Sequence, residues 1–151
     1  MNELPKSRPE ASNALWNPNA AANWSLLFSP LFGAYLHALN WQSLGETQRA
    51  SASMKWVYAG IVLLVFYLVI GFFVSDKKAV DGIGRLAGLI YLVSWYRGSA
   101  KTQAKYVKER FETSYPRKSW GKPLLIAVGC MLGFFVLSVL IGIFLGATGA
   151  A

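Results

Sequence analysis

Few side chains in this 151-residue sequence belong to types that perform chemistry, and their spacing forms no catalytic or metal-binding set. The chain has one histidine, His37, and one cysteine, Cys130, whereas a zinc site needs three or four ligands. The sequence contains no HExxH or Cys-x-x-Cys pattern, no phosphate-binding glycine loop and no Ser–His–Asp set that its spacing could justify. We therefore expect no enzyme, no bound metal and no cofactor.

His37 lies within NWSLLFSPLFGAYLHALNW, residues 23–41, which contain no acidic or basic side chain. An ionisable group inside a membrane could relay a proton or contact a partner, but a neutral histidine hydrogen-bonded to a serine or a carbonyl is the simpler expectation. Asp81 and Arg85 occupy the apolar segment 79–96 one helical turn apart, so on a helix they can pair with each other. Arg85 could also extend its guanidinium to the nearer interface.

The composition indicates that these residues are held by membrane helices. Apolar residues make up 54% of the chain and the mean hydropathy is +0.37, whereas charged residues make up 15%, against about 25% in soluble proteins. Two uncharged stretches, 56–74 and 123–146, reach the roughly 17–25 residues that cross about 30 Å of hydrocarbon as a helix. We therefore expect an all-α integral membrane protein.

Two further apolar segments, 20–39 and 79–96, complete a predicted bundle of about four membrane helices. Asn17 followed by Pro18 is a favourable helix start, and Pro30 should kink a span over 20–39 because it removes one backbone hydrogen bond. A hairpin that enters and leaves the bilayer on the same side is the alternative for this segment. The glycines and alanines of 79–96 suit a helix packed inside a bundle. The expected organisation is a flexible N-terminal tail and one transmembrane bundle: 1–18 and 19–147.

Basic residues and tryptophans set the expected topology, but they disagree on the number of spans. With four spans, tryptophans form a belt at one interface, and the loops on that side hold ten basic residues against four on the other. With three spans and 79–96 on the surface, the cytoplasmic side holds thirteen basic residues and the other side holds two. Both alternatives place the basic loop 97–122 in the cytoplasm, and we expect four spans. The belt would consist of Trp41, Trp56, Trp95 and Trp120.

The basic loop contains a helical pattern of its own. Apolar residues recur at intervals of four, three and four, which is one helical face: Ala100, Ala104, Val107 and Phe111. A neighbouring face is cationic: Lys101, Lys105 and Lys108. Glu109 can pair with Lys105 one turn away. No stacking-aromatic motif accompanies the net charge of +8, so we expect no nucleic-acid partner. The lysines form either a solvated face against lipid headgroups or a docking surface for anionic lipid or an acidic protein.

The last apolar segment contains small residues at GxxxG-type spacing, which let another helix approach closely. These residues are Gly129, Gly133, Ser138, Gly142 and Gly146. The expectation is packing within the chain's own bundle, and homodimerisation is the alternative. Cys130 is expected to be a small packing residue, because a single cysteine can form no disulfide within the chain.

The stretch NPNAAANWSLLFSPLFGAYLHALNWQSLGE resembles a motif found in small inner-membrane proteins of Gram-negative bacteria. This resemblance implies a multi-pass protein of the bacterial inner membrane, and it carries no functional residues. The format, a short polytopic protein without catalytic groups, is similar to that of membrane-embedded immunity proteins. Those proteins protect a cell against secreted toxins that attack the inner membrane, including type VI effectors.

Two functions are therefore expected as alternatives. The first is an immunity protein that binds a cognate protein toxin in or at the bilayer. The second is a structural or accessory membrane protein that recruits a partner or anionic lipid through its basic loop.

Overall fold

The structure of this chain is a computed structural model that describes residues 14–74 and 76–148. Within these ranges every named element is helical, which confirms the predicted all-α class. The chain forms two compact units divided after Lys118. The first unit contains α1 to α5 and the second contains α6, and the single bundle expected over 19–147 stays a prediction.

Two of the described helices are long and apolar enough to cross a membrane: α3 (Thr47–Phe73) and α6 (Gly121–Thr148). They contain the predicted spans 56–74 and 123–146. The helix of α3 begins earlier than expected, because the polar residues 47–55 continue it instead of forming a loop.

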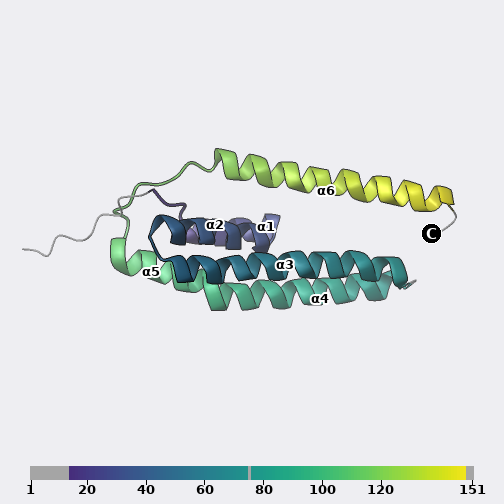
Figure 1. Ribbon diagram of the computed structural model, residues 1–151, viewed down its shortest axis with the longest axis horizontal. Helices are drawn as coiled ribbons and strands as arrows, with labels where there is room; N and C mark the ends of the chain where they lie inside the picture. The colour runs from purple at the N-terminus through teal and green to yellow at the C-terminus, as the bar shows by residue number, and fades with distance from the viewer. Residues whose placement is uncertain (1–13, 75, 149–151) are drawn as a thin grey trace, which may run out of the picture. The chain divides into compact units, whose positions relative to one another are not determined.

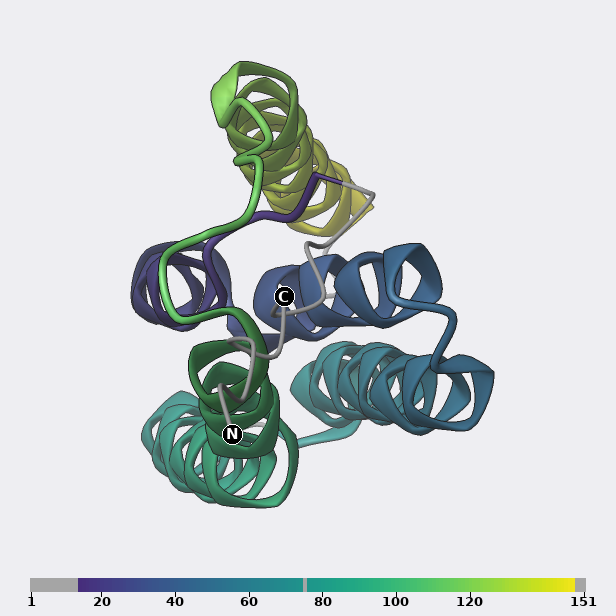
Figure 2. The same ribbon diagram turned by 90° about the vertical axis from the view of Figure 1, so that its left-hand side faces the viewer.

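The first apolar segment forms a hairpin of two short helices, α1 (Pro18–Phe28) and α2 (Pro30–Ser43). The helices form an antiparallel hairpin (Figures 1 and 2). His37 in the middle of α2 contacts the carbonyl of Pro18 at the start of α1. At 11 and 14 residues they are about 16 and 21 Å long, shorter than about 30 Å of hydrocarbon. The prediction of one kinked span over 20–39 is therefore wrong, and the hairpin alternative has the geometry found.

The chain reverses at Ser29 and Pro30. Asn17 caps the start of α1 as expected, because its side chain accepts hydrogen bonds from two backbone amides of the first turn. The Ser29 amide donates to the carbonyl of Ser25 at 3.0 Å and ends α1, and its φ of 114° turns the chain out of the helical path. Pro30 then takes the first position of α2, where its missing N–H is not needed. Pro30 starts a new helix instead of kinking an old one.

The helix after α3, α4 (Lys77–Trp95), runs antiparallel beside it (Figure 1). The two helices interlock through two tyrosines that lie over two glycines. Tyr67 of α3 covers Gly84 of α4, and Tyr91 of α4 covers Gly60 of α3. A Cβ added at Gly84 or Gly60 would stand 2.5 or 2.7 Å from the tyrosine. The small residues of the segment 79–96 thus contribute to close helix packing.

The helix of α4 continues without a break through the π-helical turn η1 (Tyr96–Ala100) into α5 (Lys101–Phe111). Of the apolar face predicted for the basic loop, Ala100, Val107 and Phe111 are buried and Ala104 is half-buried. This face packs on other residues of the first unit. A π turn adds a residue and so changes which side chains face the core on either side of it.

Residues that precede α1 are part of the first unit. Leu15 is fully buried; its amide donates to the carbonyl of Pro116, and its carbonyl accepts from the amide of Lys118, both at 2.9 Å. This part of the segment 1–18, expected to be a flexible tail, is therefore held in the fold. Residues 1–13 lie outside the described residues.

The centre of the first unit is Trp95, whose side chain is fully buried against Ala34, Val57 and Ala100. Trp41 is only 2% exposed. The predicted interfacial belt is therefore wrong for these two tryptophans, which are core residues. The indole of Trp95 reaches its position because Gly33 has no side chain; a Cβ there would stand 2.6 Å from the ring.

Replacing Gly33 with alanine should lower the stability of the first unit by about 1–3 kcal/mol, since the added methyl overlaps Trp95 and Ser25 in a packed core. Thermal unfolding in detergent, followed by tryptophan fluorescence, measures the effect. Gly82→Ala in α4 is the matched control, because a Cβ there meets nothing within 4 Å. Equal melting temperatures for Gly33→Ala and Gly82→Ala would contradict the packing described.

Candidate functional site

Buried polar side chains cluster where α2 meets α5. His37, Asn40 and Gln103 are each 0% exposed. Burying a polar group is costly unless it is hydrogen-bonded, so the partners of these three residues define the arrangement, and only Nδ1 of His37 among their side-chain nitrogens and oxygens has none within the described ranges.

The side chain of Asn40 connects the segment before α1 to α5. Its Oδ1 accepts from the amide of Trp16 at 3.0 Å, and its Nδ2 donates to the carbonyl of Trp16 at 2.8 Å and to Oε1 of Gln103 at 3.2 Å. Gln103 in turn donates from Nε2 to the carbonyl of His37 at 2.8 Å. Gln103 was not singled out from the sequence. The available indication was its place on the apolar face of α5, between Ala100 and Val107.

His37 is a buried core residue bonded to a backbone carbonyl, which is the contact that the simpler expectation describes. Its Nε2 lies 3.2 Å from the carbonyl oxygen of Pro18, and because a carbonyl can only accept, Nε2 carries the proton. The ring also packs beside the indole of Trp95, with centroids 5.6 Å apart. Burial lowers the pKa of His37 to about 4, and the smaller effect of the Pro18 hydrogen bond opposes it.

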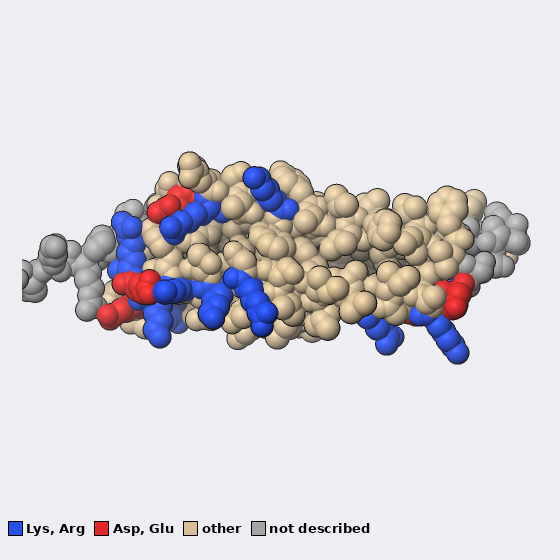
Figure 3. All heavy atoms as spheres, turned by 90° about the horizontal axis from the view of Figure 1, so that it is seen from below, with Lys and Arg blue, Asp and Glu red and all other residues tan. Residues whose placement is uncertain are grey.

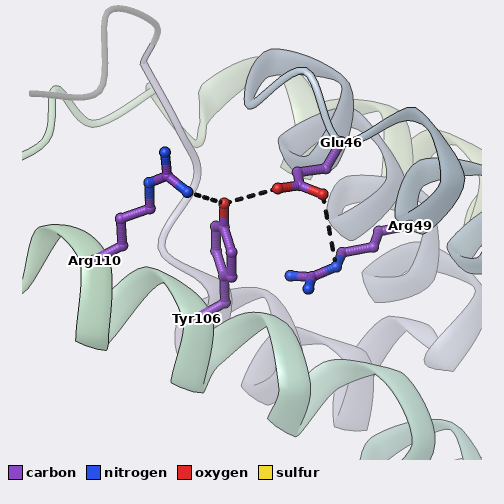
Figure 4. Close-up of polar contacts among 4 residues, drawn as sticks. All are labelled: Glu46, Arg49, Tyr106 and Arg110. Carbon is purple, nitrogen blue, oxygen red and sulfur yellow. Dashed lines mark hydrogen bonds and ion pairs between the residues drawn. The ribbon is translucent and has the colours of Figure 1, made fainter. Parts of the chain in front are cut away.

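A partly exposed cluster of charged and aromatic side chains also holds α5 to the start of α3 (Figure 4). The hydroxyl of Tyr106 donates to Glu46 at 2.9 Å and accepts from Arg110 at 2.8 Å. Arg49 approaches Glu46 at 3.7 Å and lies over the rings of Tyr106 and Trp41, 4.7 and 5.0 Å from their centroids. Burial, with the hydrogen bond to Glu46, raises the pKa of Tyr106. These contacts join α5 to the start of α3, in addition to the buried hydrogen bonds that join α5 to α2.

The three lysines predicted on the basic loop all lie exposed on α5: Lys101, Lys105 and Lys108. Figure 3 shows Lys and Arg side chains gathered around this helix, while the middle of α3 and α4 is uncharged. The expected pair between Lys105 and Glu109 forms at 3.7 Å. Both partners are mostly exposed, so this pair contributes little stability and leaves the face cationic.

Asp81 and Arg85 lie at a groove of about 580 Å³ in the first unit. The groove runs between α3 and α4, and the hairpin turn at Ser29 closes one end of it. Within the described part of the chain, Asp81 is not paired with Arg85 as expected; its Oδ1 accepts from the hydroxyl of Tyr67 at 3.1 Å. Both side chains remain exposed, and the groove walls are mainly apolar.

The small residues of α6 occupy two sides of that helix. At about 100° per residue, Gly129 and Gly133 share one side, and the remaining three lie roughly opposite. Those three are Ser138, Gly142 and Gly146. The Ser138 hydroxyl donates to the carbonyl of Phe134 at 2.8 Å, so its own helix satisfies it. The prediction that these residues form a helix-packing face or a homodimer contact stays a prediction, now divided between two faces.

No family model, no curated protein and no solved structure matches the chain. The resemblance to small inner-membrane proteins therefore stays a prediction.

Acid should destabilise the first unit through His37. Its pKa is lowered in the folded state, so its stabilising contribution is present above about pH 6.5 and is lost as the pH falls towards about 4. The free energy of unfolding should fall by up to about 1.4 kcal/mol per pH unit in this window. Unfolding in detergent at stepwise pH measures the slope, and His37→Gln should flatten it. Identical slopes for the two proteins would show that His37 is not the group responsible.

Proposed function

We propose that this chain is a non-enzymatic membrane protein of the bacterial inner membrane that holds a rigid basic platform at the cytoplasmic face. The basic platform consists of Lys101, Lys105 and Lys108 on α5. The observation that supports it best is that α5 is one continuous helical run with α4, is joined to α2 by buried hydrogen bonds, and is joined to the start of α3 by a partly buried one. A membrane helix thus leads directly into a fixed cationic surface.

Exposed apolar side chains support insertion of α3 and α4 together. Val62 and Phe66 on α3 are 65% and 55% exposed, and Leu86 on α4 is 60% exposed, which is costly in water and favourable in lipid. The hydroxyl of Tyr91 donates to the carbonyl of Trp56 at 2.6 Å, so the two helices are joined at this end as well as at Tyr67. Because α4 lies along α3, it crosses wherever α3 crosses.

The hairpin changes the expected side of the N-terminus. Since α1 and α2 go in and return, the N-terminus lies on the same side as the start of α3. Membrane crossings by α3, α4 and α6 then leave twelve basic residues on the cytoplasmic side and two, Lys77 and Lys78, on the other. This division follows the positive-inside rule more closely than the four-span alternative, which gives ten against four.

Reporter fusions test this topology. A reporter at the N-terminus or after Lys118 should read cytoplasm, and one inserted between Asp76 and Lys77 or placed after Ala151 should read periplasm, because the basic segments are retained inside. A periplasmic N-terminus would restore the four-span model. A cytoplasmic reading at Asp76 together with a cytoplasmic N-terminus would mean that neither α3 nor α4 crosses, which contradicts the proposed topology.

The basic platform should bind anionic lipid headgroups. Lysines near an anionic surface contribute about 1 kcal/mol each, so replacing all three platform lysines with glutamine should weaken binding of phosphatidylglycerol by roughly a hundredfold. Titrating this lipid into the detergent-solubilised protein and following its melting temperature measures the change. The matched control is Lys77→Gln with Lys78→Gln, which removes two cations from the far end of α4. If the control weakens binding as much as the platform variant, the platform is not the lipid site.

The toxin-immunity hypothesis stays a prediction, and the two faces of α6 make its test sharper. A toxin helix can lie against one face only, so either Gly133→Leu or Gly142→Leu should abolish protection of cells that make the cognate toxin, but not both. Loss of self-association in the same variants would instead indicate the homodimer.

A further inference from the structure

We propose that the groove between α3 and α4 is a binding site for one phospholipid with a phosphoethanolamine headgroup. This inference rests on the proposed insertion of α3 and α4 into the membrane, and it concerns the end of these helices opposite to the basic platform.

The groove has the shape of a slot with one closed end. Its lining on α4 extends from Val80 to Tyr91, a length of about 16 Å at 1.5 Å per residue. Ser29 and Leu31 at the hairpin turn close the inner end, beside Gly60. The outer end opens towards the start of α4, where a membrane-embedded helix pair meets the headgroup layer.

The charges at the outer end match those of a zwitterionic headgroup. The cationic side chain lies deeper and the anionic side chain lies nearer the helix start, where the phosphate and the ammonium of such a headgroup would lie. Arg85 has no ion-pair partner among the described residues, and its long side chain can reach a lipid phosphate. Asp81 lies one turn nearer the helix start, with Oδ1 bonded to Tyr67 and Oδ2 left to accept from an ammonium. In phosphatidylethanolamine the ammonium is likewise farther out than the phosphate. A singly anionic headgroup would place no cation at Asp81.

The other charges at this end do not change the match. Asp76 caps α4 by accepting from the amides of Lys78 and Ala79. Lys77 donates to the carbonyl of Gly71 at 3.2 Å. The remaining groove wall is mainly apolar, and Gly88, where an added Cβ would meet nothing within 4 Å, leaves room for an acyl chain.

Native mass spectrometry of the full chain in mild detergent tests the site, with equal amounts of palmitoyl-oleoyl phosphatidylethanolamine, phosphatidylcholine and phosphatidylglycerol. In a chain whose platform lysines are replaced by glutamine, which removes the proposed phosphatidylglycerol site, one phosphatidylethanolamine per chain should bind in preference to the other two lipids. Asp81→Asn keeps an oxygen that accepts from Tyr67 but removes the charge, so it should reduce this preference roughly tenfold, the effect of one charge-assisted hydrogen bond. Arg85→Gln should weaken the phosphatidylethanolamine complex by a similar factor.

A matched pair of glycine variants separates the groove from the rest of α4. A Cβ added at Gly88 or at Gly82 meets nothing within 4 Å, but only Gly88 lines the groove. Gly88→Leu should therefore abolish the lipid complex, and Gly82→Leu should retain it. The result that overturns the proposal is retention of phosphatidylethanolamine by Gly88→Leu, or an unchanged lipid preference in Asp81→Asn. A Gly88→Leu chain that instead loses a dimer would show that a second copy occupies the groove, which also overturns it.

The amount of each variant in the membrane fraction distinguishes failure of the proposed function from failure of the groove proposal. A wild-type chain absent from membranes contradicts the proposed function. A chain that is present in membranes but binds the three lipids equally contradicts only the groove proposal.

Discussion

The contact between Trp95 and Gly33 is the constraint on which the first unit depends. An indole can be buried here only because the facing residue of α2 has no side chain, and α2 can face α4 only because the chain reverses at Ser29. The same reversal sets the inner end of the groove and returns the chain to the side from which it came. One packing contact thus links the core, the groove and the proposed side of the N-terminus.

Buried hydrogen bonds then fix the polar end of this unit. Trp16, Asn40 and Gln103 join three segments that are far apart in the sequence. Such a network is costly to bury unless every member is satisfied, and it specifies one arrangement where apolar packing alone would allow several. This is the physical basis for describing α5 as a platform: its lysines are exposed, but the helix that carries them is clamped.

The parts of the structure that follow from local patterning could be predicted from the sequence. Long uncharged runs define α3 and α6, and the periodicity of Ala100, Val107 and Phe111 defines the buried face of α5. The hairpin could only be offered as an alternative, because Pro30 is compatible both with a kink and with a helix start. The burial of Trp41 and Trp95 and the role of Gln103 could not be predicted, since they arise from contacts between distant segments. The spacing of Asp81 and Arg85 showed only that they could pair, whereas Tyr67 from the facing helix donates its hydrogen bond to Asp81.

The distance across the hairpin tests the account most directly. With Cys130 replaced by serine, spin labels at Asn19 and Leu39 can be measured by double electron–electron resonance in nanodiscs. A continuous helix would separate these positions by about 30 Å, whereas antiparallel helices packed 8–10 Å apart should give about 20 Å or less. The hairpin predicts the short distance as the single population, and it predicts that Gly33→Leu, which forces Trp95 away, broadens it. A dominant distance near 30 Å in the otherwise unaltered chain would contradict the hairpin and, with it, the groove and the topology that depend on it.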